Sequence, residues 1–470
     1  MTACPPGRLQ AVRRQDTAGH SGTQPVRKRQ VRAPLAPQAP RWHPPGIKLY
    51  DFFLYTSAAA LVFGKLFFPS NDPLTGTLLA FLTYAVGFLA RPIGGLVFGH
   101  FGDRVGRKKL LVLSLLLMGG STCAMGILPT YASVGVLAPI LLTLLRLVQG
   151  FALGGEWGGA VLIVSEHGDD KRRGFWASWP QCGAPGGNLL ATAVLAILAA
   201  TQSDEAFLGW GWRIPFLLSG VLVVIGLWIR LAVSESPAFL LARKHSLAAQ
   251  NNGATEHAPV VEVFRKSWRA VLITIGSRMA ENVSYYVITA FILVYVTTGL
   301  SLPKSAGLNA VLIGSAVHFV TIPLWGKLSD RIGRRPVYLF GAIGMAVWSF
   351  VFFAMLDTKN SAIIILAATI GLVLHGAMYG PQAAFFSEQF PTRVRYTGLS
   401  VGGQLSSIAA GAVAPLIAVA LFKEFGSTVP VSLYVVAMCA LTVIALLAAR
   451  ETKGESLHTE VLTERGHVSA

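Results

Sequence analysis

The sequence predicts an all-α integral membrane protein with twelve transmembrane helices in two similar six-helix halves. Of its 470 residues, 53% are hydrophobic and only 13% are charged, which is about half the charged fraction of an ordinary soluble protein. The hydrophobic residues gather into runs close to the roughly 20 residues that a helix needs to cross a bilayer. One short basic motif also occurs twice, once in each half of the chain. Together these observations predict the fold class.

Twelve apolar spans can be placed in the chain, and we expect each to form one helix. Glycine and proline inside the spans do not argue against this, because packed membrane helices tolerate both. The approximate limits are 49–68, 75–98, 110–128, 134–163, 174–201, 212–233, 268–298, 305–326, 336–356, 361–386, 396–422 and 429–449.

These spans divide the chain into five parts. Residues 1–48 are rich in proline and arginine and cannot form a packed core, so we expect a disordered basic segment there. Two six-helix halves follow at 49–233 and 268–449, separated by a polar cytoplasmic linker at 234–267. We expect residues 450–470 to form a cytoplasmic tail.

The distribution of charge indicates how the helices are oriented. A net charge of +17 also suits a nucleic-acid-binding protein, but the basic residues lie in alternate loops between spans, and such loops face the cytoplasm. We therefore expect a multi-pass protein of the plasma (inner) membrane, embedded in lipid, with both termini cytoplasmic and no nucleic-acid partner. We also expect a monomer. Neither the scattered cysteines nor the histidines show metal-ligand spacing, so we expect no metal site.

The repeated motif is the most specific feature of the chain. Residues 99–109 read GHFGDRVGRKK and residues 326–335 read GKLSDRIGRR. A phosphate-binding glycine loop would follow a strand, whereas these stretches lie between apolar spans. A plain positive loop would explain the basic residues but not the aspartate or the placed glycines. We expect the glycines to allow a tight turn and the aspartate to accept N–H bonds at the start of a neighbouring helix.

The two stretches resemble the signature loops of the major facilitator superfamily, between helices 2 and 3 and between helices 8 and 9. The resemblance implies that they form a cytoplasmic charge network which stabilises the outward-open state. A second repeat supports it, since Glu166 precedes Arg173, and Glu388 precedes Arg395, by seven residues. We assign to this gating network, with Glu156 near the cytoplasmic end of helix 4, the residues Asp103, Arg104, Arg107, Glu156, Glu166, Arg173, Asp330, Arg334, Glu388 and Arg395.

Charged residues within the spans of the first half are functional candidates, because burying a charge in a bilayer is costly. Asp51 lies in an apolar and aromatic run of helix 1, where it either carries a proton, contacts substrate or has a structural role. Arg146 lies near the middle of helix 4 and resembles the arginine that the superfamily uses in proton coupling. A structural ion pair is the alternative for both residues. For Arg91, toward the inner end of helix 2, we favour a structural pairing with a neighbouring acid.

A second polar cluster is expected in helices 7 and 10. Arg278 and Glu281 are three residues apart, so they share a helical face and can pair with each other. The alternatives are a self-satisfied ion pair and a cavity site. Near them we expect Asn282, Tyr285, His375 and Tyr379 to line that cavity. For His318, in helix 8, we favour a hydrogen-bonded core histidine.

Four stretches of the chain resemble the metabolite:proton symporter subfamily. They begin at Tyr50, Arg91, Arg146 and Arg278. Members of the subfamily carry shikimate, dicarboxylates, citrate, or osmolytes such as proline and betaine. The resemblance implies no enzyme and no cofactor, but a secondary active transporter that takes up a small polar metabolite with protons by alternating access.

Arg146 and Arg278 lie at similar depth, one in each half. Two such cations favour an organic anion as substrate, such as shikimate or another carboxylate. Asp51 would instead favour a proline or betaine type of osmolyte, and a transporter-like sensor without net transport is a further alternative. One departure from the subfamily weakens the role of Asp51. Lys48 and Leu49 stand where its members have Glu-Trp, and the prolines upstream should shorten helix 1 and leave Asp51 nearer the membrane interface.

Overall fold

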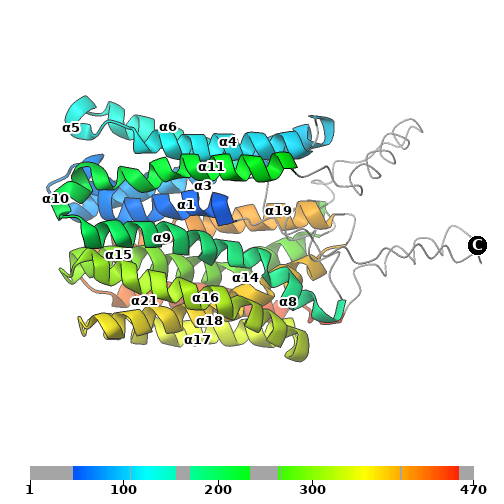
Figure 1. Ribbon diagram of the computed structural model, residues 1–470. Helices are drawn as coiled ribbons and strands as arrows, with labels where there is room; N and C mark the ends of the chain where they lie inside the picture. Colours follow the sequence, from blue (N-terminus) through cyan, green and yellow to red (C-terminus); the bar gives the residue numbers. More distant parts are fainter. Residues whose placement is uncertain are drawn as a thin grey trace, which may run out of the picture. The chain divides into compact units, whose positions relative to one another are not determined.

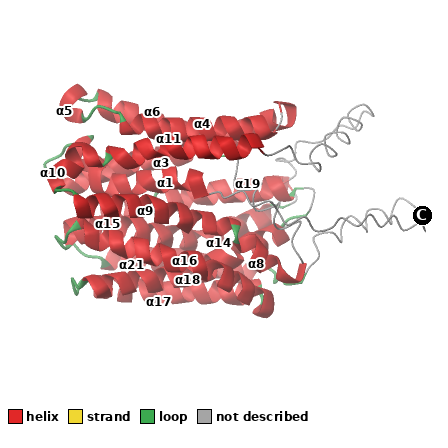
Figure 2. Cartoon of the chain, in the orientation of Figure 1, coloured by secondary structure: helices red, strands yellow, loops and turns green. Residues whose placement is uncertain are grey.

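The computed structural model describes residues 46–105, 107–154, 170–232, 263–265, 267–391 and 394–454. Within these ranges every regular element is a helix and no strand occurs (Figure 2). All of them belong to one compact unit, His43–Ala470. The predicted basic segment and most of the predicted linker and tail lie outside the described residues, so the division into five parts stays a prediction.

The helices of the first half correspond to the first six predicted spans. In the first span α1 (Gly46–Ala58) continues through a π-helical turn, η1 (Ala59–Phe63), into α2 (Gly64–Leu66). The other principal elements are α3 (Pro73–Val105), α4 (Arg107–Gly126), α6 (Leu137–Leu153), α8 (Arg173–Ser178), η3 (Pro180–Cys182), α9 (Gly183–Thr201) and α11 (Arg213–Ala232). Two short helices, α5 (Tyr131–Val134) and α10 (Asp204–Ala206), precede α6 and α11.

The second half repeats this plan. Its principal helices are α14 (Trp268–Tyr286), α15 (Ile292–Val294), α16 (Lys304–Ile332), α17 (Arg334–Leu356), α18 (Ser361–Gln389), α19 (Arg395–Ser406), α20 (Ala414–Phe425) and α21 (Val429–Ala448). Two π turns, η5 (Val287–Phe291) and η7 (Ser407–Ala412), join α14 to α15 and α19 to α20. Among the described residues, eight helices are long and apolar enough to cross a membrane, and the bent pair around residue 212 makes a ninth.

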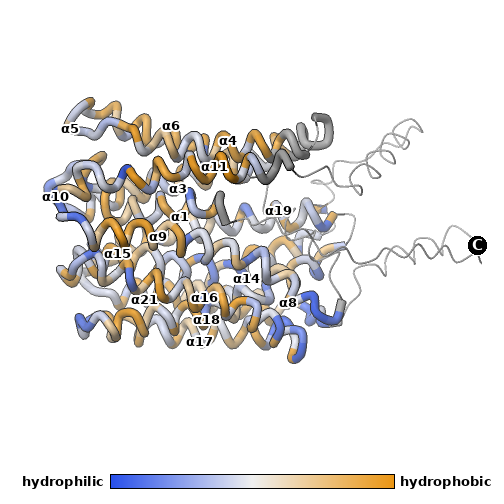
Figure 3. The backbone as a smooth tube through the Cα atoms, in the orientation of Figure 1, coloured by the Kyte–Doolittle hydropathy of each residue, from blue (hydrophilic) through white to orange (hydrophobic). Residues whose placement is uncertain are grey.

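The two halves show the same pattern of helix packing. In the first half α1 packs on α9, α3 on α6, and α4 on α11; in the second, α14 packs on α19, α16 on α18, and α17 on α21. Between the halves α9 contacts α16, and α3 contacts α20. Figure 1 shows the long helices running side by side along a common direction. In Figure 3 the hydrophobic positions follow the helices and many of the hydrophilic ones gather at their ends.

The repeated motif is more helical than the sequence predicts. In the second half, α16 continues to Ile332 and α17 begins at Arg334, so Gly333 alone interrupts the helix. Its φ of +106° is one that only glycine adopts readily. The tight turn predicted for the glycines is therefore correct for Gly333 and wrong for Gly326, which lies inside α16. A Cβ on Gly326 would meet the carbonyl oxygen of Gly174 at 2.6 Å, so close packing on α8 explains that glycine.

Candidate functional site

A buried ion network joins the two halves at the end of the bundle where α16 passes into α17, which we call the basic end. The carboxylate of Glu388, in the last turn of α18, lies at its centre. Arg173 Nη1, from the first half, donates to its Oε1 at 2.8 Å, and Arg334 Nη2 lies 3.3 Å from the same oxygen. All three side chains are almost fully buried. One acid thus holds α8, α17 and α18 together.

A second carboxylate crosses between the halves beside it. Asp330 accepts the backbone N–H groups of Gly174 at 2.8 Å and of Phe175 at 2.9 Å, at the start of α8. It also accepts from Arg334 Nη1 at 2.6 Å. This is the geometry expected of the motif aspartate, because the first N–H groups of a helix have no partners within the helix. Arg395 is also buried and donates from Nε to the Phe390 carbonyl oxygen at 3.2 Å.

The sequence analysis missed two residues of this network, which belong to the segment predicted as a tail. Glu451 accepts the backbone N–H groups of Arg334 and Arg335, each at 2.9 Å, and so caps the start of α17. Thr452 donates to Glu388 Oε2 at 2.6 Å. The one sequence feature that marks Glu451 is its position as an acid directly after the last apolar span, and this position does not identify Arg334 as its partner. Five predicted network residues are not described. These are Glu156 and Glu166, which lie outside the described ranges, and Asp103, Arg104 and Arg107, whose side chains are not described.

In the first half, Arg146 of α6 lies among aromatic rings. Its guanidinium carbon is 4.2 Å from the ring centre of Tyr55 and 4.8 Å from those of Phe52 and Tyr84. Nη1 donates to Gln149. The side chain is 1% exposed, and Nε and Nη2 have no hydrogen-bond partner among the described residues. Because arginine stays charged in proteins, these two nitrogens are charged donors whose hydrogen-bonding capacity is unused among the described residues.

Close packing of α3 against α6 fixes the position of Arg146. A Cβ on Gly150 would lie 1.9 Å from the carbonyl oxygen of Gly87, and one on Gly154 would lie 1.9 Å from that of Arg91. A Cβ on Gly87 would meet Arg146 Nε at 2.8 Å. Gly150 and Gly154 therefore allow α6 to pack closely on α3, and Gly87 leaves the space that the guanidinium occupies.

Arg91 and Asp51 occupy the same region in different ways. Arg91 lies over the rings of Phe88 at 3.8 Å and Phe52 at 4.4 Å, so its neighbours among the described residues are rings and not the predicted acid. Phe52 is shared with Arg146. Asp51 is 2% exposed and accepts a hydrogen bond from Ser219 of α11. The structure therefore brings Arg91, which we predicted to be structural, onto the ring that Arg146 also contacts.

In the second half, Glu281 is the centre of a buried polar cluster. Its Oε2 accepts from Arg278 Nε at 3.4 Å, Asn282 Nδ2 at 3.2 Å and Gln382 Nε2 at 3.1 Å. Arg278 also donates to the Gly403 carbonyl oxygen at 3.2 Å. The predicted pairing of Arg278 with Glu281 is present, and Gln382 was not predicted. Gln382 also accepts from Gln181 of η3 at 3.1 Å, which links the cluster to the first half.

Two histidines extend this cluster. His375 Nδ1 of α18 lies 3.0 Å from His318 Nε2 of α16, and His375 Nε2 lies 3.7 Å from Glu281 Oε1. The rings of Tyr285 and Tyr379 lie 5.1 and 5.4 Å from that of His375, centre to centre. His318 is thus hydrogen-bonded and buried as expected, but its partner is a site residue.

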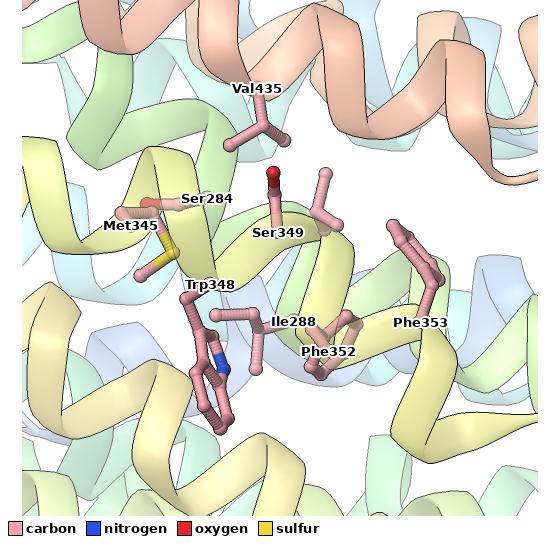
Figure 4. A pocket seen from close by; sticks show the side chains of 9 residues that line it. Ser284, Ile288, Met345, Trp348, Ser349, Phe352, Phe353 and Val435 are labelled. Carbon is pink, nitrogen blue, oxygen red and sulfur yellow. The ribbon is translucent and has the colours of Figure 1, made fainter. Parts of the chain in front are cut away.

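Aromatic rings connect the two polar clusters across the contact between the halves. Phe53 lies 5.5 Å from Tyr285, and Tyr84 lies 5.9 Å from Tyr286, centre to centre. A small apolar pocket lies elsewhere, within the second half alone, between α14, α17 and α21 (Figure 4). Its lining contains none of the predicted site residues. We take the region between the two polar clusters as the candidate site because the clusters hold Arg146 and Glu281, which the sequence analysis singled out.

At the opposite end of the bundle, exposed ion pairs join the halves. Lys423 Nζ lies 2.7 Å from Asp72 Oδ2, and Lys304 Nζ lies 2.6 Å from Asp204 Oδ1. Hydrogen bonds from Lys423 and Thr75 lower the pKa of Asp72 from 3.8 to about 2. The described contacts therefore connect the two halves at both ends, with buried ion pairs at the basic end and exposed ones here.

Comparison with known proteins gives consistent matches over most of the chain. A family model described as "Sugar (and other) transporter" matches residues 47–461. The shikimate transporter of Escherichia coli strain K12 is 40% identical over 406 residues, which cover 86% of this chain and 92% of that protein. The proline/betaine transporter of Salmonella typhimurium strain LT2 is 34% identical over 416 residues, covering 87% and 82%.

Solved structures agree in fold. A structure of the proton:xylose symporter XylE, a major facilitator superfamily protein, superposes with a TM-score of 0.66 at 18% identity and covers 88% of this chain and 97% of that one. An inward-open structure of XylE from E. coli gives 0.61 at 19% identity, covering 88% and 98%. The helix order, the repeated packing and the extent of these matches lead to one conclusion. The chain belongs to the sugar (and other) transporter family of the major facilitator superfamily, and it is a multi-pass membrane transporter rather than an enzyme.

Proposed function

We propose that the protein is a symporter that takes up a small organic anion together with protons, by alternating access of a site between its halves. The observation that carries this proposal is Arg146. Two of its donor nitrogens are buried and have no partner among the described residues. A carboxylate can accept paired bonds from one guanidinium, so an anion satisfies these donors where a neutral molecule does so less well.

The anion binds between Arg146 and Arg91 on one side and the Glu281 cluster on the other. Arg91 lies near enough to Arg146 and Arg278 for the three positive charges to repel one another. An anion bound among them would reduce this repulsion. Asn282, Tyr285 and Tyr379 supply polar groups and rings on the second-half side. The 40% identity to a protein named as a shikimate transporter supports a carboxylate as the substrate class.

Protons drive the uptake in this proposal, and no cofactor takes part. Asp51 and Glu281 are buried acids, and such residues within a span are the usual carriers of protons in transporters. The network at the basic end, from Arg173 and Asp330 to Glu388, closes that side while the opposite side opens. The homologous network of the first half is assigned to Asp103, Arg104, Arg107 and Glu166, with Glu156 beside it.

The proposal also fixes the surroundings of the protein. The basic end faces the cytoplasm because basic loops are retained there, so both termini are cytoplasmic. The membrane is the plasma (inner) membrane, in keeping with a relative named as an inner membrane metabolite transport protein, which is 40% identical over 416 residues. The transporter works as a monomer, since the site lies between two halves of one chain.

An osmolyte symporter is the second candidate. It is favoured by the proline/betaine relative and by the rings around Arg146, because aromatic faces also bind quaternary ammonium groups. A sensor that binds substrate without transporting it is a third candidate. The buried charges in both halves do not specifically favour a sensor over a transporter.

Uptake into liposomes tests the proposal. Purified protein is reconstituted, an acidic outside is imposed, and labelled shikimate is followed with and without a proton-conducting uncoupler. Unlabelled shikimate, a dicarboxylate and betaine then compete at fixed pH. We expect accumulation that the uncoupler abolishes and that carboxylates block. Competition by betaine alone would favour the osmolyte symporter, and binding without accumulation would favour the sensor.

A further inference from the structure

The side chain of Gln382, in α18, makes hydrogen bonds to both halves of the protein at once. Its Oε1 accepts from Gln181 Nε2 of the first half at 3.1 Å. Its Nε2 donates to Glu281 Oε2 and to the Tyr338 hydroxyl, each at 3.1 Å. Both glutamines are almost completely buried. The function proposed above gives no role to Gln382.

The orientation of this amide follows from its partners. An ionised carboxylate only accepts hydrogen bonds, so the group of Gln382 that faces Glu281 must be the amide nitrogen. The second N–H is taken by the hydroxyl of Tyr338, which itself donates to the Ser277 carbonyl oxygen at 2.8 Å. The oxygen of Gln382 therefore faces the first half, where Gln181 donates to it.

The bond between the two glutamines is the innermost of three successive contacts that join the segment 173–181 to α18. The two segments meet in antiparallel order. From the basic end inward the contacts are the ion pair of Arg173 with Glu388, the buried cluster of Ala177 with Ala383 and Ala384, and the bond of Gln181 to Gln382. The first and third contacts are six residues apart on α18, which is about 9 Å of helix. A movement that parts α8 from α18 at the basic end should therefore also draw Gln181 away from Gln382.

The three polar groups form a chain of hydrogen bonds that ends on a carboxylate. Gln181 donates to the oxygen of Gln382, and the nitrogen of the same amide donates to Glu281. Hydrogen bonds in such a chain polarise one another, because donation to the oxygen of an amide makes its N–H a stronger donor. The bond to Glu281 is thus strongest while the two glutamines are in contact. The carboxylate in turn strengthens the contact between the halves.

We propose that Gln382 couples the basic end to the Glu281 cluster, so that a change at one is felt at the other. Gln382 is a positioning residue in this proposal, since it acts through Glu281 and through Gln181. By linkage the coupling runs in both directions. Weaker acceptance at Glu281 favours opening of the basic end, and opening removes support from Glu281. The inference deepens the proposed function and rests on it in placing substrate beside Glu281.

Ala177 provides a reporter for opening of the basic end. It is fully buried in the cluster with Ala383 and Ala384, so a cysteine in its place can react only when α8 and α18 separate. The native cysteines are first replaced by alanine; these are Cys4, Cys123, Cys182 and Cys439. The rate at which N-ethylmaleimide labels Ala177→Cys is then measured in liposomes. No substrate is present, so this result does not depend on the uptake experiment described above.

Two methionine variants break the bond between the halves from either side. Gln382→Met keeps the length of the side chain but removes its polar groups, and we expect labelling to become about threefold faster or more. Gln181→Met removes the same bond. Because one bond is lost in both, the double variant should react about as fast as either single variant. The matched control is Gln389→Met in the same helix, since Gln389 donates only to the Arg450 carbonyl oxygen, at 3.3 Å, among the printed bonds of α18, and should keep the wild-type rate.

The coupling itself is measured with Glu281→Gln. A neutral amide oxygen accepts a weaker hydrogen bond than a carboxylate, so this variant should also speed labelling, by about threefold, where both glutamines are intact. In the Gln382→Met or Gln181→Met background, Glu281→Gln should have little further effect. A merely structural role of Gln382 would leave the effect of Glu281→Gln the same in every background.

Two results would overturn the inference. The first is an effect of Glu281→Gln that is absent, or that is equally large with and without Gln382. The second is a wild-type labelling rate in both methionine variants. If Gln382→Met does not fold, Gln181→Met decides, because it leaves the side chains of the Glu281 cluster unchanged. A wild-type protein that takes up neither carboxylates nor betaine would instead remove the proposed function, which is read from uptake and not from labelling.

Discussion

Arg173 and Glu388 lie 2.8 Å apart and join the two halves of the transporter at the basic end, although 215 residues separate them in the chain. Because Glu388 also accepts from Arg334 and Thr452, one carboxylate connects elements of both halves with the segment after α21. The structure therefore concentrates the closure of this end in a residue that a single substitution can neutralise.

The first prediction concerns that residue. In Glu388→Gln, Arg173 and Arg334 each lose one charged partner within a buried network, and removing one partner of a buried ion pair costs about 3–5 kcal/mol. We expect the basic end to open more often, so that a cysteine placed there is labelled faster and uptake falls. Glu205→Gln, on an exposed acid of α10, is the control. Wild-type labelling and uptake in Glu388→Gln would contradict the role given to the network.

The second prediction concerns the motif aspartates. In Asp330→Asn the side chain keeps one acceptor oxygen but loses the charge that faces Arg334 and the first N–H groups of α8. Access to the site from the basic end should therefore increase. The homologous variant Asp103→Asn should act in the same direction. The measurement is the rate at which a cysteine on the outward side is labelled, and we expect this rate to fall in both variants. Opposite shifts in the two variants would show that the motifs do not share a role.

The third prediction concerns Arg146. Lysine lacks the planar fork of donors, so Arg146→Lys should not restore transport although it keeps the charge. We expect proton-driven uptake to fall by roughly tenfold or more while the protein still inserts, since paired charge-assisted bonds are lost. Arg269→Lys is the control, because Arg269 also lies over a ring, that of Trp268 at 5.5 Å, but is exposed. Near-normal uptake in Arg146→Lys would make Arg146 a structural residue.

The fourth prediction uses two glycines. Gly150→Ala places a methyl group 1.9 Å from the carbonyl oxygen of Gly87, whereas Gly120→Ala meets nothing within 4 Å. Overpacking costs about 1–3 kcal/mol or more when backbone must move. Thermal unfolding in detergent should therefore show a lower Tm for Gly150→Ala and little change for Gly120→Ala. Equal stability of the two variants would mean that α3 and α6 are not held at this distance.

The fifth prediction concerns pH. The pKa of Asp72 is lowered from 3.8 to about 2, so its contact with Lys423 is fully present above pH 3.8 and is lost only as the pH falls toward 2. This ion pair should not contribute to any pH dependence of uptake near neutrality. Asp72→Asn can change the rate of uptake, but the shape of its pH profile between mildly acidic and mildly alkaline conditions should match that of the wild type. An altered profile would contradict this.

The fold was predictable because its determinants are local and repeated. Twelve apolar runs and two copies of one motif are visible without knowledge of any contact, and the match to the family confirms the fold class that they predict. The pairing of Arg278 with Glu281 was also predictable, since residues three apart on a helix are neighbours.

The remaining parts of the site depend on how separate helices are rotated against one another. The sequence places His318 and His375 at similar depth, but only the packing of α16 on α18 brings their ring nitrogens together. Arg91 was expected to meet an acid because a charge in a span needs a partner, whereas among the described residues the rings of Phe52 and Phe88 lie on it. The contact of Glu451 with Arg334 joins residues 117 positions apart, a separation at which no periodicity gives a signal.

The π turns make the number of residues in a helix as important as the kinds of residues in it. Each one holds a residue more than an ordinary helical turn, and one residue corresponds to a rotation of about 100° around the helix axis. In the segment from α14 to α15, the turn Val287–Phe291 directly follows the face that carries Glu281 and Tyr285. Deleting a single residue there would leave a regular helix, but everything beyond it would face different neighbours. A count of residues, with no change in their hydrophobicity, thus keeps the two ends of this helix in phase.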